Sequence, residues 1–118
     1  MNFGVLVNFM SKSIEKKATK ENNPLEKALG MVGKKYDLLI LETVFKRNKR
    51  AGFNQMLKEV PGINPRILSL RLKNLEANKL LTKNLVLGTP VKTEYALTQK
   101  SEELIEIIEK LKTWVQKY

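Results

Sequence analysis

This 118-residue chain contains no cysteine and no histidine. It therefore has no Cys or His nucleophile, no His general base and no zinc site built on those ligands. Disulfides are excluded too, which agrees with a reducing compartment. Its carboxylates are scattered, without a nucleophile–base pair or a metal cluster, so we expect no catalytic residue, no metal site, no cofactor and no enzymatic activity.

Long apolar runs are also scarce. The apolar stretch at residues 3–10 is broken by Gly4 and Asn8 and is too short to span a bilayer. We find no signal-peptide pattern either. These absences predict a soluble, cytoplasmic protein that has no membrane partner.

Acidic residues are few relative to basic ones, and the formal net charge is +10. The excess is +7 over residues 23–79, but only +2 over 1–22, +1 over 80–97 and zero over 98–118. Within the most basic part, a short cluster precedes the segment 51–78. It consists of Lys46, Arg47, Lys49 and Arg50. Such a cluster is typical of phosphate contacts, and equally of an exposed helix end.

Segment 51–78 has the spacing of a helix-turn-helix. Residues 52–60 carry one apolar stripe at helical intervals, and Pro61-Gly62 then ends that helix. Asn64-Pro65 predicts the start of a second helix, because Asn caps a free amide and proline suits the first helical position. In motifs of this kind the second helix enters the DNA major groove.

The second helix has a buried stripe of Leu68, Leu72 and Leu75, so the opposite face and its flanks should face outward. We predict DNA contacts from these faces and from the residues around the turn. The candidates are Arg50, Asn54, Asn64, Arg66, Ser69, Leu70, Arg71, Lys73 and Asn74. A basic face on a surface helix can also be merely solvated.

After Lys79 the pattern alternates, as in strands. Two alternating segments flank Gly88-Thr89-Pro90, and a three-residue turn there would pair Leu81 with Leu97. The sequence thus predicts a hairpin next to the helix-turn-helix, which is a winged helix. Near the tip, Lys83, Thr89 and Lys92 are further candidates for DNA contact, although the hairpin could simply close the core.

The ends of the chain differ in character. Residues 1–22 form an N-terminal extension that is either flexible or associated with a dimer, and its second half, residues 11–22, is polar and Lys-rich. Asn23-Pro24 resembles a capped helix start, so we expect the winged-helix domain to occupy residues 23–118, with Leu25 and Leu29 facing inward. A final helix from about Gln99 to Tyr118 carries two apolar stripes, and the second favours a homodimer. The predicted interface residues are Leu104, Ile107, Ile108, Leu111, Trp114, Val115 and Tyr118.

From Asn23 to Thr98 the chain resembles the HxlR-type regulators, a branch of the MarR-like winged-helix proteins. The resemblance rests on the order of several short pieces: Pro24-Leu25-Glu26, Gly33-Lys34-Lys35-Tyr36, Gly52-Phe53, Pro61-Gly62-Ile63-Asn64 and Glu94-Tyr95-Ala96-Leu97-Thr98. It implies a homodimeric transcription regulator that dimerises through its terminal helices. Many members have a thiol-sensing cysteine where this chain has Asn23, so thiol sensing is excluded here.

The expected fold is α+β, mainly α: a winged helix-turn-helix with a two-stranded wing and a long C-terminal dimerisation helix. The expected partners are double-stranded DNA and a second copy of the chain. The alternative is a winged helix used for protein assembly, with weak, non-specific DNA binding. The sequence specifies neither an operator nor a small-molecule effector.

Overall fold

The computed structural model describes residues 23–118, and the predictions for residues 1–22 lie outside this part. The chain divides into two units, residues 1–33 and 34–118. In the first unit, helix α2 spans Pro24–Val32. The Asn23 side chain caps it by accepting a hydrogen bond from the Glu26 amide at 3.1 Å, which confirms the predicted start.

The apolar side chains of α2 correct one expectation. Leu25 is 68% exposed and Leu29 is 53% exposed, and none of the nine residues of this helix is buried. The prediction that they face inward is therefore wrong for this chain.

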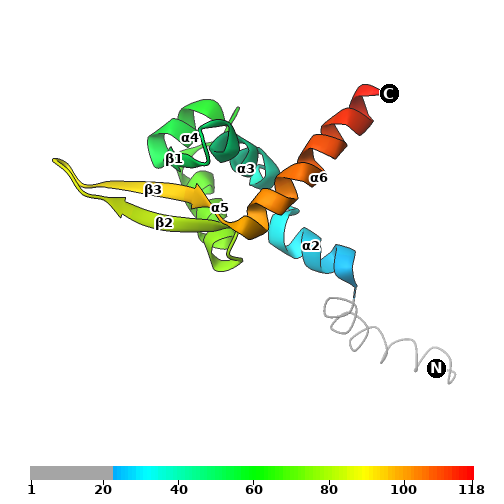
Figure 1. Ribbon diagram of the computed structural model, residues 1–118, viewed down its shortest axis with the longest axis horizontal. Coiled ribbons are helices and arrows are strands. Elements are labelled where there is room, and N and C mark those ends of the chain that lie inside the picture. Colours follow the sequence, from blue (N-terminus) through cyan, green and yellow to red (C-terminus); the bar gives the residue numbers. More distant parts are fainter. Residues whose placement is uncertain (1–22) are drawn as a thin grey trace, which may run out of the picture. The chain divides into compact units, whose positions relative to one another are not determined.

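The second unit has the element order of a winged helix (Figure 1). It contains, in order, α3 (Asp37–Lys46), β1 (Arg50–Gly52), α4 (Phe53–Glu59), α5 (Pro65–Ala77), β2 (Leu81–Val86), β3 (Lys92–Leu97) and α6 (Gln99–Gln116). The core lies where the helices meet the sheet. Its fully buried side chains include Ile40, Leu41, Val44, Met56, Leu68, Leu72, Leu75 and Leu81.

The sheet contains one strand more than the sequence predicted. Among the described residues, three antiparallel strands lie in the order β1-β3-β2. Strand β1 covers residues 50–52, where the sequence predicted the end of a basic cluster and the start of a helix. It pairs Ala51 with Tyr95 along β3. The expected two-stranded wing is thus the outer part of a three-stranded sheet.

The predicted hairpin register is confirmed. Leu81 pairs with Leu97, and the ladder continues outward to Val86 and Lys92. Burial is restricted to the inner end, where Leu81 and Tyr95 are 1% and 8% exposed. Beyond them the β2–β3 hairpin, here called the wing, extends away from the core (Figure 1).

Candidate nucleic-acid interface

The turn between α4 and α5 has the geometry that its residues predicted. Gly62 adopts φ 77°, a left-handed conformation that glycine accepts without steric cost. The hydroxyl of Tyr36 donates a hydrogen bond to the Gly62 carbonyl oxygen at 3.2 Å and so ties the turn to the start of α3. The Asn64 side-chain oxygen accepts from the Ile67 amide at 2.9 Å, which starts α5 at Pro65. This Asn64 oxygen is thereby engaged in capping.

Helix α5 presents an exposed face opposite its buried leucines. Leu68, Leu72 and Leu75 are at most 1% exposed. The outward set, here called the reading face, consists of Arg66, Ser69, Leu70 and Lys73, all of them exposed. Leu70 is 50% exposed, although it is apolar. This arrangement agrees with the sequence prediction for these four residues.

Arg71 departs from the expected arrangement. Its side chain is only 18% exposed, and its Nε lies 2.7 Å from Oδ1 of the fully buried Asp37. The reason is its position three residues after Leu68 and four before Leu75, which places it beside the buried stripe. Arg71 thus points toward α3. Asn74 is half-buried on the same side of the helix, and Asn78 donates to its carbonyl oxygen at 3.0 Å.

The basic cluster before the helix-turn-helix is largely paired with the protein's own carboxylates. Its four ion pairs are Lys46–Glu42, Arg47–Glu59, Lys49–Glu102 and Arg50–Glu94. The Arg50 pair is the longest, at 3.7 Å, and Arg50 belongs to β1 rather than to a free loop. Exposed pairs of this kind are weak and can be exchanged for phosphate. The sequence could not show the partners, since several of them lie far along the chain.

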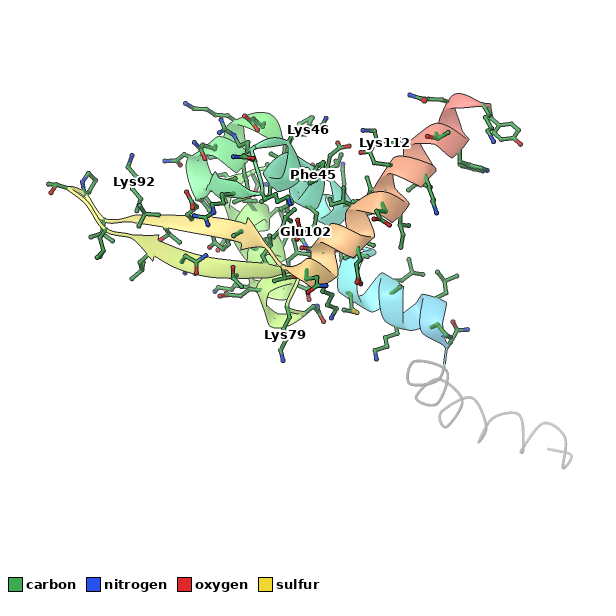
Figure 2. All side chains as sticks on the ribbon, in the orientation of Figure 1. Phe45, Lys46, Lys79, Lys92, Glu102 and Lys112 are labelled. Atoms are coloured by element: carbon green, nitrogen blue, oxygen red, sulfur yellow. The ribbon has the colours of Figure 1, made fainter. Side chains whose placement is uncertain are left out.

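The wing carries cations without such partners. Lys92 (Figure 2) and Lys83 are exposed, and within the described residues neither forms an ion pair. Thr89 lies at the tip and is also exposed. The tip is apolar as well, because Leu87 and Val91 are 85% and 54% exposed. The three predicted wing residues are therefore accessible, while the outer wing contributes nothing to the core.

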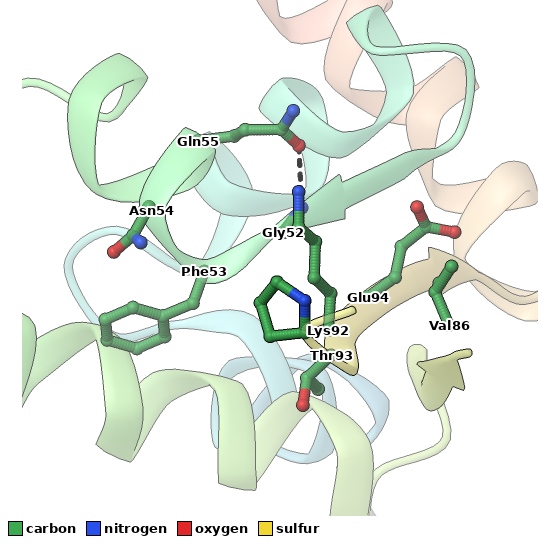
Figure 3. A pocket seen from close by; sticks show the side chains of 9 residues that line it. Gly52, Phe53, Asn54, Gln55, Val86, Lys92, Thr93 and Glu94 are labelled. Atoms are coloured by element: carbon green, nitrogen blue, oxygen red, sulfur yellow. Dashed lines mark hydrogen bonds between the residues drawn. The ribbon is translucent and has the colours of Figure 1, made fainter. Parts of the chain in front are cut away.

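A hollow of about 580 Å³ lies between the start of α4 and the wing (Figure 3). It is lined by Gly52, Phe53, Asn54, Gln55, Val86, Pro90, Lys92, Thr93 and Glu94. Asn54 and Lys92, two predicted DNA-contacting residues on separate elements, are thus brought to one site. Its wall is fixed by a hydrogen bond of 2.8 Å from the Gly52 amide to the Gln55 side chain. No pattern in the sequence pointed to this hollow.

The apolar residues of α6 divide into a buried set and an exposed set. Ile105 and Ile108 are 4% and 6% exposed, because they pack into the domain. Ile108 was predicted as an interface residue, and its burial corrects that prediction. The remaining set, here called the α6 patch, is exposed by half or more and consists of Ile107, Leu111, Trp114, Val115 and Tyr118. Leu104 is half-buried between the two sets.

A charge cluster joins α6 to α3. Lys112 Nζ lies 2.9 Å from Oε2 of Glu42 and 3.3 Å from Oε1 of Glu109 (Figure 2). The hydrogen bond from Lys112 lowers the pKa of Glu42, against the opposing effect of partial burial. The same contacts raise the pKa of Lys112, the Glu42 hydrogen bond most of all. Each group thus favours the charged form of the other.

Across residues 23–118, we find no group of three or more His, Cys, Asp or Glu side chains that could hold a metal ion. Over the same range, every helix is too short or too polar to cross a membrane. The reading face and the wing each present exposed cations, of the kind that contact a polymer of phosphates.

Comparison with known proteins agrees with this geometry. A family model described as HxlR-like helix-turn-helix matches residues 31–118. The chain belongs to this family. Family members are transcriptional regulators of the helix-turn-helix type, which implies DNA binding, and they are not a class of enzymes. The HTH-type transcriptional regulator YodB of Bacillus subtilis is 30% identical over 94 residues, covering 80% of this chain and 82% of YodB.

Solved structures of HxlR-like and MarR-like regulators share the fold. The reduced form of YodB from Bacillus subtilis has a TM-score of 0.70 at 27% identity, covering 80% of this chain and 92% of that one. The redox regulator HypR in its reduced form has a TM-score of 0.69 at 28% identity, covering 80% and 92%. The winged helix-turn-helix predicted from the sequence is therefore confirmed for this chain.

Proposed function

We propose that this protein is a sequence-specific regulator that binds double-stranded DNA as a homodimer on an inverted-repeat operator. The observation that carries the proposal is the reading face of α5. Arg66 and Lys73 form no ion pair within the described residues, whereas the cluster before the helix-turn-helix is paired. Cations without protein partners are available for DNA, and a bidentate arginine is the commonest reader of guanine.

Two kinds of contact are proposed on this surface. Arg66 and Leu70 lie in the first half of α5, where base edges are within reach, and Leu70 is suited to a thymine methyl group. Lys73 and the wing residues Lys83 and Lys92 would contact phosphates. The first kind supplies sequence preference. The second supplies affinity that every sequence shares and that salt weakens.

The α6 patch supports dimerisation. Four apolar side chains of α6, including Trp114, stay exposed, as does Tyr118 just after the helix, and large aromatic residues are enriched at the centres of interfaces. Pairing two α6 helices through one shared patch would relate the two α5 helices by a two-fold axis. The preferred site would then be an inverted repeat whose half-sites are about one turn, or roughly 10–11 base pairs, apart.

The signal that controls this regulator would differ from that of its relatives. YodB and HypR are described in reduced and oxidised or diamide-treated forms. The 118 residues of this chain contain no cysteine. We therefore propose that binding here is insensitive to thiol oxidants. A transcription regulator of this kind would act in the cytoplasm.

The test is selection of genomic DNA fragments by the purified full chain, followed by titration of the best fragment and of a scrambled duplex. We expect the best fragment to contain an inverted repeat and to bind far more tightly than the scrambled one. A dimer that contacts about 6–10 phosphates should lose about 10³-fold or more in affinity between 50 and 200 mM salt. Weak binding without preference is what a protein-assembly module would show, and it would contradict the proposal.

A further inference from the structure

The start of α3 makes two polar contacts with the helix-turn-helix. Asp37, the first residue of α3, is fully buried and accepts a hydrogen bond from Arg71 Nε on α5 at 2.7 Å. Its second oxygen accepts from the backbone N–H of Lys34 at 3.0 Å. The preceding residue, Tyr36, binds the carbonyl oxygen of Gly62 in the turn. Two consecutive residues thus hold both the turn and α5.

The backbone at Tyr36 is in an unfavourable conformation. Its φ is 83°, in the left-handed region that residues with a side chain seldom occupy. A conformation of this kind persists only where the surroundings impose it. Here the Gly62 hydrogen bond on one side and the Asp37 contacts on the other provide that constraint. Residues 36 and 37 are therefore held in one conformation by contacts on both sides.

Apolar packing alone does not fix the rotation of a helix closely. The contacts of Leu68, Leu72 and Leu75 are non-directional. With side chains, a helix has a radius of about 5–6 Å, so a rotation of about 20° moves a side-chain tip by about 2 Å. Hydrogen bonds to base edges hold only over a few tenths of an ångström around their usual length. Base reading by Arg66 therefore requires a directional restraint on α5.

We propose that Asp37 and Arg71 are a positioning pair that sets the rotation of α5, so that Arg66 and Leu70 meet base edges while Arg71 itself does not contact DNA. A charge-assisted hydrogen bond with defined geometry supplies the directional restraint. This proposal rests on the proposed function. It assigns an indirect role in specificity to Arg71, which the sequence alone placed among the DNA contacts.

Removing either partner should lower specificity without removing a phosphate contact. In Asp37→Asn, an NH₂ group replaces one of the two accepting oxygens, so either Arg71 or Lys34 faces a second donor in place of its acceptor. In Arg71→Gln, the buried carboxylate loses its cation. For each variant we expect the ratio of affinities for preferred and scrambled DNA to fall at least tenfold. The slope of log affinity against log salt should stay as in the unmodified protein.

Two further variants make the test specific. Lys73→Gln also removes one cation from α5, but from the reading face. It should lower affinity for both duplexes and reduce the salt slope by about one. The double variant Asp37→Asn with Arg71→Gln should regain specificity, because the introduced glutamine can accept from the NH₂ group of the introduced asparagine, whose oxygen still accepts from Lys34. Circular dichroism and thermal melting would show that each variant folds.

The outcomes separate the two proposals. In one outcome, Arg71→Gln reduces the slope of log affinity against log salt as Lys73→Gln does, and leaves the ratio of affinities for preferred and scrambled DNA unchanged. That result would make Arg71 a phosphate contact and overturn the positioning role. Full specificity in Asp37→Asn would overturn it as well. A double variant no better than the two single ones would show that no rotational restraint had been restored, which also counts against the positioning role. If the unmodified protein itself preferred no DNA fragment, the proposed function would fail, and this proposal with it.

Discussion

Replacing Trp114 with alanine should weaken the proposed dimer strongly while leaving the domain folded. Trp114 is 58% exposed and lies in the α6 patch, with its ring 5.7 Å from that of Tyr118. It contributes little to the core of its own protomer, so its truncation opens no buried cavity there. The loss should therefore affect association far more than stability.

The magnitude follows from the exposed surface. If a Trp side chain offers about 250 Å², its exposed part is on the order of 140 Å². At about 25 cal/mol per Å², full cover by a partner is worth about 3.5 kcal/mol per protomer. A two-fold interface contains the residue twice. Even if half of that total is realised, the loss of about 3.5 kcal/mol raises the dimer dissociation constant by about 400-fold.

Sedimentation equilibrium over a range of protein concentrations measures this constant directly. Gln116→Ala is the matched control, because Gln116 is exposed, polar and two residues further along, on the opposite side of α6. It should leave the constant unchanged. DNA titrations of the same samples should show that specific binding weakens together with association, since two recognition helices must engage one site.

The reasoning would be refuted by a Trp114→Ala protein that sediments as the unmodified protein does at every concentration. It would also be refuted by a variant that becomes monomeric yet binds the full inverted repeat with unchanged affinity. The first result would remove the α6 patch from the interface. The second would remove dimerisation from DNA recognition.

Two other predictions concern DNA reading and pH. Arg66→Ala should cost roughly 1–3 kcal/mol of binding free energy on the preferred site and relax the preference at one base position, whereas Lys92→Ala should weaken binding to all sequences alike. Quantitative titration of single-base variants of the site distinguishes the two. Equal losses for Arg66→Ala on preferred and random DNA would rule out base reading by this residue. The pKa of Glu42 is lowered in the folded state by the Lys112 hydrogen bond, so its stabilising effect is complete above the ordinary value of 4.5 and is lost as the pH falls through the lower folded value. Lys112→Gln should therefore have a lower free energy of unfolding than the unmodified protein in denaturant unfolding at about pH 7. The difference in unfolding free energy between the two proteins should shrink as the pH falls below the ordinary Glu value. A difference that stayed constant down to about pH 3 would show that the ion pair is not its cause.

Local signals determined much of this fold. The starts of α2 and α5 followed from Asn23-Pro24 and Asn64-Pro65, because a cap depends on residues only two or three positions away. The register of the wing followed from alternation and turn length, and Leu81 does pair with Leu97. The outward position of Arg66 and Leu70 followed from the leucine stripe of the same helix.

Other features depended on contacts between distant parts of the chain. Strand β1 has three residues, which are too few to show a period, and it exists because β3 offers an edge for pairing. Arg71 lies at the border of the buried stripe, and only Asp37, 34 residues earlier, decides that it points inward. The basic cluster is likewise paired with carboxylates on other elements.

The two stripes of α6 show the division between sequence and tertiary structure most clearly. The sequence determined that Ile107 and Ile108 belong to apolar faces about 100° apart, because each residue turns the helix by that angle. Both faces satisfy the same helical periodicity. Only packing against the rest of the domain buried Ile108 and left Ile107 60% exposed. Periodicity locates apolar faces on a helix, but only the tertiary contacts decide which of them the core covers.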